Sequence, residues 1–489
     1  MNLPERPVTI LIAALGGEGG AVMADWLFDA AIREGFPAQS TSIPGVAQRT
    51  GATTYYLEIY PVRREALGGA EPVLSLTPSP GNVDAMVASE LVEAARAMQN
   101  GYVSPERTTL IASTHRVYAT VEKMHMADGR YDSARAIEAA RKLARRAILA
   151  DMRTLAAEAG TVINAVLFGA LAGSGVLPVS REACEAAIRR AGRGAEASLR
   201  GFAAGYEVAA GLRPAPEPPA PPRRATELGE IVQLALARLR DYQGEAYAAL
   251  YRKRLEPFLE GDPVLAAELA RQLALWMCYE DIIRVADLKT RPERFARIRR
   301  EVGAKEGEPV VVVDYLKPGI EEFAALLPPR LGARLVGWAE RRGKLQAYNV
   351  GMRVRTSGLF GYLLVRALAW LRPWRPHTYR YAEEQRLIER WLARVREAAA
   401  KSPALALEIA RCAALLKGYG ETHRRGRANF LAILDALVEN PPTADPDEQA
   451  AAIRKAREAA LADPEGKALG GALGRPVTWL RPAAPREAR

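Results

Sequence analysis

The chain has 489 residues, of which 49% are hydrophobic and 26% charged, and its formal net charge is +11. A chain of this length is expected to build two hydrophobic cores, since single domains rarely grow beyond about 250 to 300 residues, and its ordinary composition excludes wholesale disorder. The positive charge would suit nucleic acid, a membrane surface or an acidic protein partner, but no known RNA- or DNA-binding motif is present, so nucleic acid is the least favoured.

The first predicted element is a buried strand at residues 8–12, followed directly by a glycine loop and a helix that ends at Gly35. The strand is an apolar run without polar alternation, as a strand covered on both faces requires. The loop reads Gly-Gly-Glu-Gly-Gly at residues 16–20, so its backbone amides can approach an anion at the start of the helix. The apolar stripe expected on the helix is Val22, Trp26, Leu27, Ala30 and Ala31.

The next strand, residues 38–43, contains no acidic residue. The dinucleotide-binding fingerprint places a ribose-binding Asp or Glu at the end of that strand, so nicotinamide and flavin binding are disfavoured. Further strands are expected at residues 54–60, 73–76, 83–88 and 109–112. A Ser-Thr-His turn at residues 113–115 follows the last of them, at the edge where open α/β sheets bind ligands. His115 can act there as a structural hydrogen-bonding residue or as a catalyst.

Helices are expected to follow these strands. One opens at Ser89, with Glu90 and Glu93 near its positive end, where simple capping explains both acids. An arginine-rich helix is expected over residues 133–159, and small residues at 164–180 predict a helix suited to close packing. Two more helices are expected at residues 181–191 and 194–209.

Six prolines between residues 212 and 224 predict an extended spacer. We therefore expect an α/β domain with a Rossmann-like, mostly parallel sheet at residues 1–211, a linker at 212–226 and a mainly helical domain at 227–489. The second domain contains one strand-like run at residues 309–315. Its helices are expected at residues 228–242, 265–276, 359–371, 381–399 and 403–417, and again from residue 429.

Two basic stretches lie in the second half. Residues 284–300 gather cations with little compensating acid, which either a solvated helix face or a surface for an acidic partner would explain. The other stretch predicts a basic turn able to hold an anion, or a helix C-cap with solvated charge. Its residues are Lys417, Gly418, Gly420, His423, Arg424, Arg425, Gly426 and Arg427.

Cysteine usage and hydropathy bear on compartment and metal binding. The three cysteines are too widely spaced for a zinc site or an iron–sulfur cluster, so we expect buried, reduced thiols. The longest apolar run, residues 359–371, is interrupted by an arginine and is shorter than the roughly 20 residues of a membrane span. The first strand follows a short polar start without a signal core. We expect a cytoplasmic protein with no membrane span.

Four motifs taken together resemble the gamma domain of 2-oxoacid:ferredoxin oxidoreductases, with the closest likeness to the beta subunit of indolepyruvate oxidoreductase. They are LGGEGG at residues 15–20, SIPGVAQRTGAT at 42–53, VDAMVASELVEAAR at 83–96 and LIASTHRVY at 110–118. The resemblance covers about the first 210 residues, and the helical second half is similar to an extension found in this subfamily. Family members usually carry a glutamine, a histidine and a glycine where this chain has Glu18, Pro44 and Thr50.

The resemblance implies one subunit of an enzyme that oxidatively decarboxylates aryl 2-oxo acids and passes electrons to ferredoxin. It implies a larger partner subunit for thiamine diphosphate, magnesium and the iron–sulfur clusters, because this chain lacks clustered cysteines and a thiamine-diphosphate motif. No catalytic residue and no metal ligand are assigned to this chain. The residues expected to meet substrate, coenzyme A or the partner are Gly16, Gly17, Glu18, Gly19, Gly20, Ser42, Gly45, Gln48, Arg49, Thr50, Gly51, Thr114 and His115.

A function from another class stays open on the same residues. A carboxylate inside an anion-binding loop repels phosphate, so Glu18, with the departures at Pro44 and Thr50, favours a non-catalytic nucleotide-binding or scaffold protein that retains the fold. A free-standing nicotinamide dehydrogenase is disfavoured by the missing acid.

Overall fold

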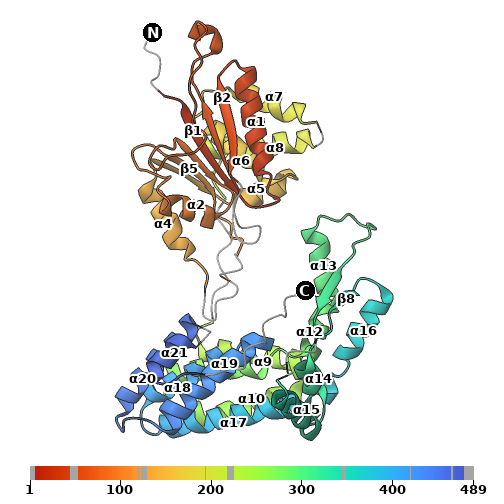
Figure 1. Cartoon of the computed structure of the whole chain (residues 1–489). Coiled ribbons are helices and arrows are strands. Elements are labelled where there is room, and N and C mark those ends of the chain that lie inside the picture. The colour runs from red at the N-terminus through yellow and green to blue at the C-terminus, as the bar shows by residue number, and fades with distance from the viewer. Residues whose placement is uncertain are drawn as a thin grey trace. The chain divides into compact units, whose positions relative to one another are not determined.

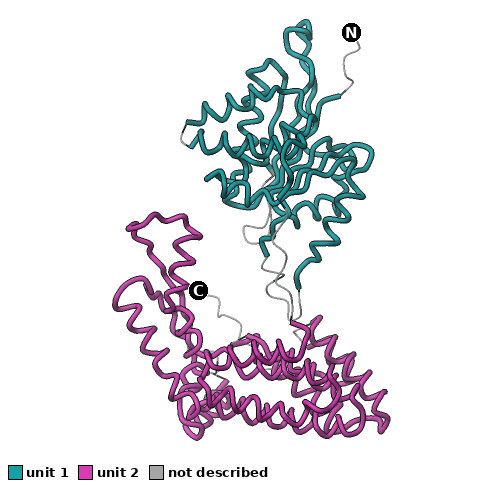
Figure 2. Tube along the Cα trace, turned by 180° about the vertical axis from the view of Figure 1, so that it is seen from behind, with its two compact units in different colours: residues 1–222 teal, residues 223–489 magenta. Residues whose placement is uncertain are grey.

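The computed structural model describes residues 6–43, 53–118, 122, 129–192, 194–216, 225–343, 345, 349–418, 420–463 and 466–477. The chain folds into two compact units, Met1–Pro222 and Arg223–Arg489 (Figure 2). Each unit has its own cluster of buried apolar side chains. The dividing point falls inside the proline-rich stretch, and the independence of the two units stays a prediction.

The first unit is built on a six-stranded sheet of order β2-β3-β1-β4-β5-β6 (Figure 1). The strands are β1 Val8–Ala14, β2 Ala38–Ile43, β3 Thr53–Ile59, β4 Ala85–Ala88, β5 Thr109–Ser113 and β6 Arg146–Ala150. The pairs from β1 through β4 and β5 to β6 are parallel, whereas β3 is antiparallel to both β1 and β2. The predicted α/β fold with a mostly parallel sheet followed by a helical region is confirmed.

Both faces of this sheet are covered by helices (Figure 1). The helices are α1 Gly20–Arg33, α2 Leu91–Gln99, α4 Ser133–Leu143, α5 Met152–Ala159, α6 Ile163–Gly173, α7 Arg181–Arg190 and α8 Ala195–Ala209. Ile10 and Ile12 of β1 belong to a buried cluster with α1, α5, α6, α7 and α8, whereas Leu11 and Ala13 belong to a second cluster with α2 and α4. Alternate residues of β1 are therefore buried on opposite faces, as its uninterrupted apolar run predicts.

Close packing of α6 against α8 depends on two glycines. A Cβ atom at Gly169 would lie 1.9 Å from the carbonyl oxygen of Phe202, and one at Gly205 would lie 1.9 Å from that of Val166. The two helix backbones are thus in direct contact, and no other residue fits at either glycine. The small-residue helix predicted for close packing is confirmed, with an end at Gly173 rather than Ser180.

Three expectations for the first unit are wrong. The single helix at residues 133–159 is instead α4, β6 and α5, because residues 146–150 pair with β5 at the edge of the sheet and this pairing overrides the helical pattern. No strand lies at residues 73–76, where Val73 is 97% exposed and the Ser75 N–H donates to Glu58 at 2.6 Å. Val22 is exposed, and its neighbour Met23 fills the core in its place.

The second unit is mainly helical, with one small two-stranded sheet. Its helices are α9 Leu228–Gln243, α10 Glu245–Leu255, α11 Pro263–Met277, α12 Ile282–Lys289, α13 Pro292–Glu301, α14 Ile320–Leu326, α15 Pro329–Arg341, α16 Leu359–Ala369, α17 Tyr379–Ala399, α18 Pro403–Arg411, α19 Gly420–Ile433, α20 Pro446–Ala462 and α21 Lys467–Leu473. The strands β7 Val313–Leu316 and β8 Met352–Arg355 pair antiparallel. Only the first of them overlaps a predicted strand.

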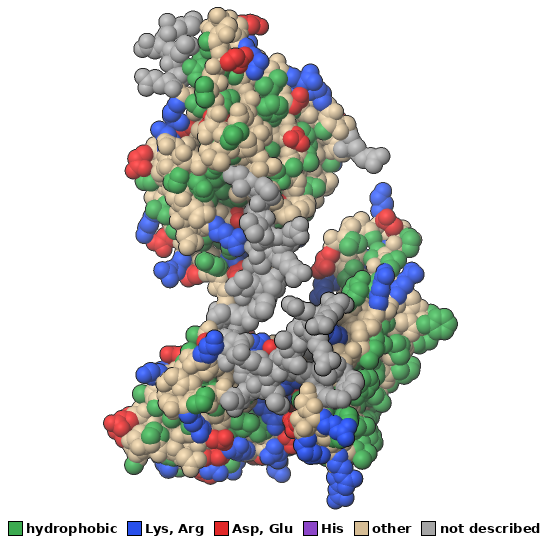
Figure 3. Space-filling view, in the orientation of Figure 1, with side chains coloured by type: hydrophobic (Ala, Val, Ile, Leu, Met, Phe, Trp, Pro, Cys, Tyr) green, Lys and Arg blue, Asp and Glu red, His purple; other side chains and the backbone are tan. Residues whose placement is uncertain are grey.

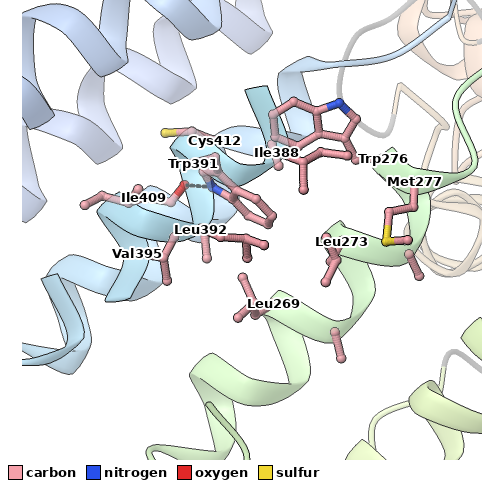
Figure 4. Close-up of a cluster of buried hydrophobic side chains, with 14 of the residues drawn as sticks. Leu269, Leu273, Trp276, Met277, Ile388, Trp391, Leu392, Val395, Ile409 and Cys412 are labelled. Atoms are coloured by element: carbon pink, nitrogen blue, oxygen red, sulfur yellow. Dashed lines mark hydrogen bonds between the residues drawn. The ribbon is translucent and has the colours of Figure 1, made fainter. Parts of the chain in front are cut away.

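Trp391 lies in the main core of this unit, where α11, α17 and α18 meet (Figure 4). Its ring is fully buried, its centroid lies 5.3 Å from that of Trp276, and its Nε1–H donates to the carbonyl oxygen of Ile409 at 3.0 Å. The apolar stripes of α11 and α17, represented by Leu273 and Leu392, pack around the ring (Figure 4). The polar atom of the buried indole is therefore satisfied, as a buried tryptophan requires.

The basic turn expected at residues 417–427 is wrong for most of its length. This stretch enters α19, and both His423 and Gly426 are buried there. His423 Nε2 lies 3.3 Å from Glu384 Oε1, and the Glu384 carboxylate also accepts a hydrogen bond from Trp276 Nε1 at 2.7 Å. Arg427 pairs with Glu383 at 2.8 Å. The stretch is helical because His423 and Arg427 find carboxylate partners on α17, one buried and one partly buried, which its own sequence does not show.

The basic stretch at residues 284–300 is also largely neutralised inside its own unit. Arg284 and Arg291 each reach Asp241 on α9 at 2.8 Å, and Arg294 reaches Asp314 on β7 at 2.9 Å. Acids distant in sequence therefore supply the compensation that the stretch itself lacks. Neither interpretation of the stretch, a solvated helix face or a surface for an acidic partner, describes these three arginines.

Candidate functional site at the glycine loop

The candidate site lies at the carboxyl ends of β1, β4 and β5, beside the loop that joins β1 to α1. Gly17 has a φ of 88° and Gly19 a φ of 76°, backbone conformations that glycine adopts without strain. A Cβ atom at Gly16 or Gly17 would meet no other atom within 4 Å. This half of the loop is therefore open, and its conformation rather than its packing requires glycine.

The second half of the loop is packed. A Cβ atom at Gly19 would lie 2.7 Å from the side-chain amide of Asn164 at the start of α6, and one at Gly20 would lie 2.5 Å from the Cβ of Ala14. These side chains leave no room for a Cβ atom at Gly19 or Gly20, and the contact of their backbone amides with substrate, coenzyme A or the partner stays a prediction. Asn164 therefore packs directly against the loop.

Glu18 turns its carboxylate toward the ends of β4 and β5. It accepts hydrogen bonds from the hydroxyl of Ser89 and from the Leu15 N–H at 3.3 Å. Its Oε1 lies 3.8 Å from Nε2 of His115. Burial alone would raise the pKa of Glu18, but His115 and Ser89 outweigh it, so the pKa lies below its ordinary value. The loop therefore carries an ionised carboxylate at neutral pH.

A short chain of hydrogen bonds orients His115. Its Nδ1 lies 2.7 Å from Oγ of Ser113, and that oxygen accepts the Met152 N–H at 3.1 Å. The Ser113 hydroxyl proton is then free to donate to Nδ1, which places the proton of a neutral imidazole on Nε2, facing Glu18. His115 is 8% exposed. The structure thus brings together two residues, Glu18 and His115, that the sequence separately assigned to the site.

Two buried polar atoms at this edge lack partners. His115 Nε2 and Thr114 Oγ1 have no hydrogen-bond partner among the residues that the structure describes. Buried polar groups are normally satisfied, so unmet donors at the carboxyl edge of a parallel sheet offer hydrogen bonds to a ligand or to a partner protein.

Next to His115, a buried cation lies between two acids. Arg116 Nε lies 3.1 Å from Glu90, and its guanidinium also pairs with Glu122. Glu90 caps α2 by accepting the Val92 N–H at 2.7 Å, as the capping interpretation requires, although the helix begins at Leu91 and Ser89 turns to Glu18 instead. Burial raises the pKa of Glu90. This cluster fixes the chain that follows His115.

Sequence reasoning placed Ser113 in the turn at the ligand-binding edge but missed its part in orienting His115, and it missed Ser89 and Arg116 as site residues. The signal that could have found Ser89 is its place directly after the buried strand β4, since the carboxyl ends of parallel strands converge at one edge. Arg116 follows the Ser-Thr-His turn and had no such signal.

Of the remaining predicted site residues, the structure describes only Ser42, which does not join this cluster. Ser42 lies on β2, paired with Tyr55, and β3 separates its strand from β1. The other predicted residues lie outside the described residues, as does Pro44. They are Gly45, Gln48, Arg49, Thr50 and Gly51.

The described residues contain no group of three or more His, Cys, Asp or Glu side chains placed to hold a metal ion. All three cysteines are buried, and burial raises the pKa of Cys184 and of Cys412 to about 12. These two thiols are therefore protonated and unreactive at neutral pH. Among the described residues no single helix is long and apolar enough to cross a membrane, although α5 and α6 pass that test together as a bent pair.

Three solved structures are similar to parts of the chain. A pyruvate oxidoreductase subunit from Thermotoga maritima is 19% identical, covers 42% of this chain and 97% of its own, and has a TM-score of 0.30. The gamma subunit of a keto/oxoacid ferredoxin oxidoreductase from Geobacter sulfurreducens is 20% identical, with coverages of 42% and 99% and a TM-score of 0.28. A 2-oxoglutarate:ferredoxin oxidoreductase from Magnetococcus marinus is 15% identical, with coverages of 59% and 46% and a TM-score of 0.31. No curated protein matches the chain.

Two family models match the chain, and the boundary between the two units lies in the gap between them. Residues 228–436 match a family of unknown function, DUF6537, and residues 9–208 match the family described as pyruvate ferredoxin/flavodoxin oxidoreductase. The resemblance drawn from the four motifs is thereby confirmed at the level of the family, though not at the level of the substrate. The first unit of this protein carries a domain of the pyruvate ferredoxin/flavodoxin oxidoreductase family.

Proposed function

We propose that this chain is one subunit of a cytoplasmic 2-oxoacid:ferredoxin oxidoreductase. The observation that carries the proposal is the family match over residues 9–208, which includes the whole sheet, the glycine loop and the Glu18–His115 pair. The enzyme needs a larger partner subunit to supply thiamine diphosphate, magnesium and iron–sulfur clusters, and the electrons pass through that partner to ferredoxin. The described part of this chain has no group of three or more His, Cys, Asp or Glu side chains placed to hold a metal ion.

The substrate in this proposal is an aryl 2-oxo acid such as indolepyruvate. Its support is the likeness of the four motifs to the beta subunit of indolepyruvate oxidoreductases. The role assigned to the first unit is to complete the site of the partner subunit with the open half of its glycine loop, Thr114 and His115. The turn that contains Arg49 is assigned to the same interface, where its guanidinium would pair with a carboxylate or phosphate.

The ionised Glu18 restricts where coenzyme A could bind. A phosphate about 4 Å from a carboxylate is disfavoured by roughly 4 kcal/mol per unit charge at an effective dielectric constant of 20. A phosphate held by this loop therefore has to lie on the side of Gly16 and Gly17, where the backbone is open. His115 faces Glu18, with its Nε2 3.8 Å from the carboxylate.

The experiment is co-expression of this chain with a thiamine-dependent, iron–sulfur 2-oxoacid oxidoreductase subunit, followed by an assay of ferredoxin reduction. We expect the chain alone to be colourless and inactive, and the complex to be brown and active with indolepyruvate or phenylpyruvate more than with pyruvate or 2-oxoglutarate. Iron–sulfur absorbance in this chain expressed alone would contradict the division of labour. A preference for a small 2-oxo acid would contradict the aryl substrate and leave the enzyme class intact.

A second candidate is a non-catalytic nucleotide-binding or scaffold protein. It is favoured by the ionised carboxylate at Glu18, where the family usually has a neutral glutamine. This candidate predicts that a complex forms and carries its cofactors, yet turns over none of the four 2-oxo acids. The same co-expression experiment therefore separates the two candidates.

A further inference from the structure

Helix α16 of the second unit buries little of an almost wholly apolar sequence. Its buried residues are Val365 and Ala369, which pack against Val354 of β8 and Ala286 of α12. The opposite face is apolar as well, with exposed fractions of 70%, 87%, 43% and 52% for Leu359, Phe360, Leu363 and Leu364. The spacing of these four residues places them on one side of the helix.

Apolar exposure is concentrated in this part of the molecule. Of the 28 large hydrophobic side chains exposed in the described part of the chain, 13 lie within residues 302–374. Hydrophobic side chains gather along the edge of the second unit that contains α16 (Figure 3). We call the four exposed residues of α16 and the neighbouring Trp370 the α16 surface. Single exposed apolar residues are ordinary, but a contiguous patch marks an interaction site.

A cavity of about 510 Å³ lies at the start of this helix. Its apolar lining residues are Phe295, Val310, Val312, Leu359 and Tyr362. The polar side chains around it are already engaged, because Thr356 donates to Asp314 at 2.7 Å and the Arg299 guanidinium donates to the carbonyl oxygen of Glu308 at 2.7 Å. The cavity therefore offers an apolar pocket for one or two side chains rather than a polar site.

The chain segment that contains the surface is basic, although Arg366 of α16 pairs with Asp287 of α12 at 3.7 Å. Residues 341–374 include seven Lys and Arg and no Asp or Glu. Arg355 adjoins the first turn of α16, where a Cβ atom at Gly361 would lie 2.1 Å from the carbonyl oxygen of Arg355, and Arg372 follows the helix at its other end. No carboxylate of the described residues lies within 4.0 Å of the guanidinium of either arginine. Both ends of the α16 surface thus carry an arginine without an ion-pair partner in the described part of the chain.

We propose that the α16 surface docks an apolar segment of a partner protein that carries Asp or Glu at both ends. The apolar face supplies the buried centre of the interface, the cavity accepts an anchoring side chain, and Arg355 and Arg372 pair with the flanking carboxylates. The cavity favours a polypeptide over a membrane, because a lipid surface does not present a side chain to fill it. The inference concerns the second unit and does not depend on the function proposed for the first.

The test is a selection of peptides displayed on phage against the full-length chain. We expect the enriched peptides to combine Leu, Phe or Trp with flanking Asp or Glu, and to bind more weakly at high salt. The variant Phe360→Asp/Leu364→Asp should weaken their binding at least about tenfold. A matched control is Leu234→Asp/Val264→Asp on α9 and α11, whose side chains are 58% and 56% exposed. This control should bind the peptides as the parent chain does.

Charge reversal tests the second part of the proposal. Arg355→Glu/Arg372→Glu should weaken binding of acid-flanked peptides about tenfold and improve binding of the same peptides with lysine flanks. If an aspartate variant fails to fold by circular dichroism, Phe360→Ala/Leu364→Ala gives the same comparison without an added charge.

Three results would overturn the proposal. The first is a selection that yields no peptide able to distinguish the parent chain from the α16 variants, or peptides without acidic flanks. The second is self-association in analytical ultracentrifugation that the α16 variants abolish, which would make a second copy the occupant. The third is co-sedimentation with vesicles of phosphatidylcholine and phosphatidylglycerol that the same variants abolish, which would make a membrane the occupant.

Discussion

Glu18 of the first unit and two buried carboxylates of the second unit are held by different kinds of partner. In the first unit, Glu18 is held by a hydroxyl and a backbone N–H, with the imidazole of His115 beside it. In the second unit, Glu384 is held by Arg380 at 2.8 Å and by the indole of Trp276, and Glu408 by Arg411 and Arg457. Carboxylates that are paired with arginines hold helices together. A carboxylate at the end of a strand, beside buried donors that lack partners, leaves hydrogen bonds available to a ligand.

The largest expected effect is a loss of stability when the buried, arginine-paired carboxylate of Glu384 is removed. Glu384→Ala leaves the buried Trp276 N–H and Arg380 without their acceptor, so the free energy of unfolding of the second unit should fall by about 3 to 5 kcal/mol. Urea denaturation followed by tryptophan fluorescence measures it. Glu245→Ala, which breaks an exposed pair with Arg240, is the control and should leave the transition where it is. An equally small effect of both variants would show that Glu384 is not what holds these helices together.

Acidification should destabilise the second unit through the same cluster. Burial would raise the pKa of Glu384, but Arg380 and His423 outweigh it and hold the pKa far below its ordinary value. A carboxyl whose pKa is lowered by folding contributes stability above its unfolded pKa, about 4.3, and loses it as the pH falls. Burial and Arg380 lower the pKa of His423 as well, which adds a loss below about pH 6.5.

The measurement is the urea midpoint of the second unit, followed from neutral pH down to below the ordinary pKa of a glutamate. The parent chain should lose stability throughout the acid range, and Glu384→Gln should lose less of it below about pH 4.3. A midpoint that rises on acidification would reverse the sign that these pKa shifts require.

The next effect concerns Arg49, which lies outside the described residues. A desolvated guanidinium paired with a carboxylate or phosphate contributes roughly 1.5 to 3 kcal/mol, and lysine keeps the charge but loses the bidentate geometry. Arg49→Lys should therefore lower turnover of the assembled complex, or weaken subunit association, by about tenfold to a hundredfold. The thermal midpoint of the isolated chain should stay nearly unchanged. A lower midpoint with normal turnover per folded complex would assign Arg49 to structure.

A smaller effect, on the affinity for coenzyme A, is expected from replacing Glu18. It tests whether the first unit binds an anion near this side chain. Glu18→Gln restores the residue usual in the family, removes the negative charge and retains an oxygen that can accept the Leu15 N–H. We expect the complex to bind coenzyme A roughly tenfold more tightly, as measured by calorimetry, with little change in stability. Unchanged affinity would mean that no phosphate approaches this side chain.

The smallest effect is expected from cutting the chain between its units. Limited proteolysis should cleave first within residues 214–224, because an extended proline-rich segment carries few contacts. Both unfolding transitions should survive the cut almost unchanged. Early cleavage elsewhere, or loss of one transition after the cut, would contradict the independence of the two units.

Much of the first unit could be predicted from its sequence. The strand, glycine loop and helix at its start were found because their signals are local: an apolar run, glycines and a stripe with helical spacing. Strand β6 was missed because its five residues also fit a helical stripe, and only their pairing with β5 decides between the two. His115 was found by its place after a strand, yet its orientation depends on Ser113 and on the Met152 N–H, which belongs to another element.

The sequence by itself determined the α/β and helical character of the two halves, the glycine loop and the scattered cysteines, because these are properties of neighbouring residues. Only the tertiary structure decided how the charges are matched. Arg291 reaches Asp241 across 50 residues, and Glu18 reaches Ser89 across 71. Such pairs have no local pattern, since folding brings their partners together from elements far apart in the chain. For that reason Arg284, Arg291 and Arg294 form internal ion pairs, while the two arginines at the ends of the α16 surface have no carboxylate partner among the described residues.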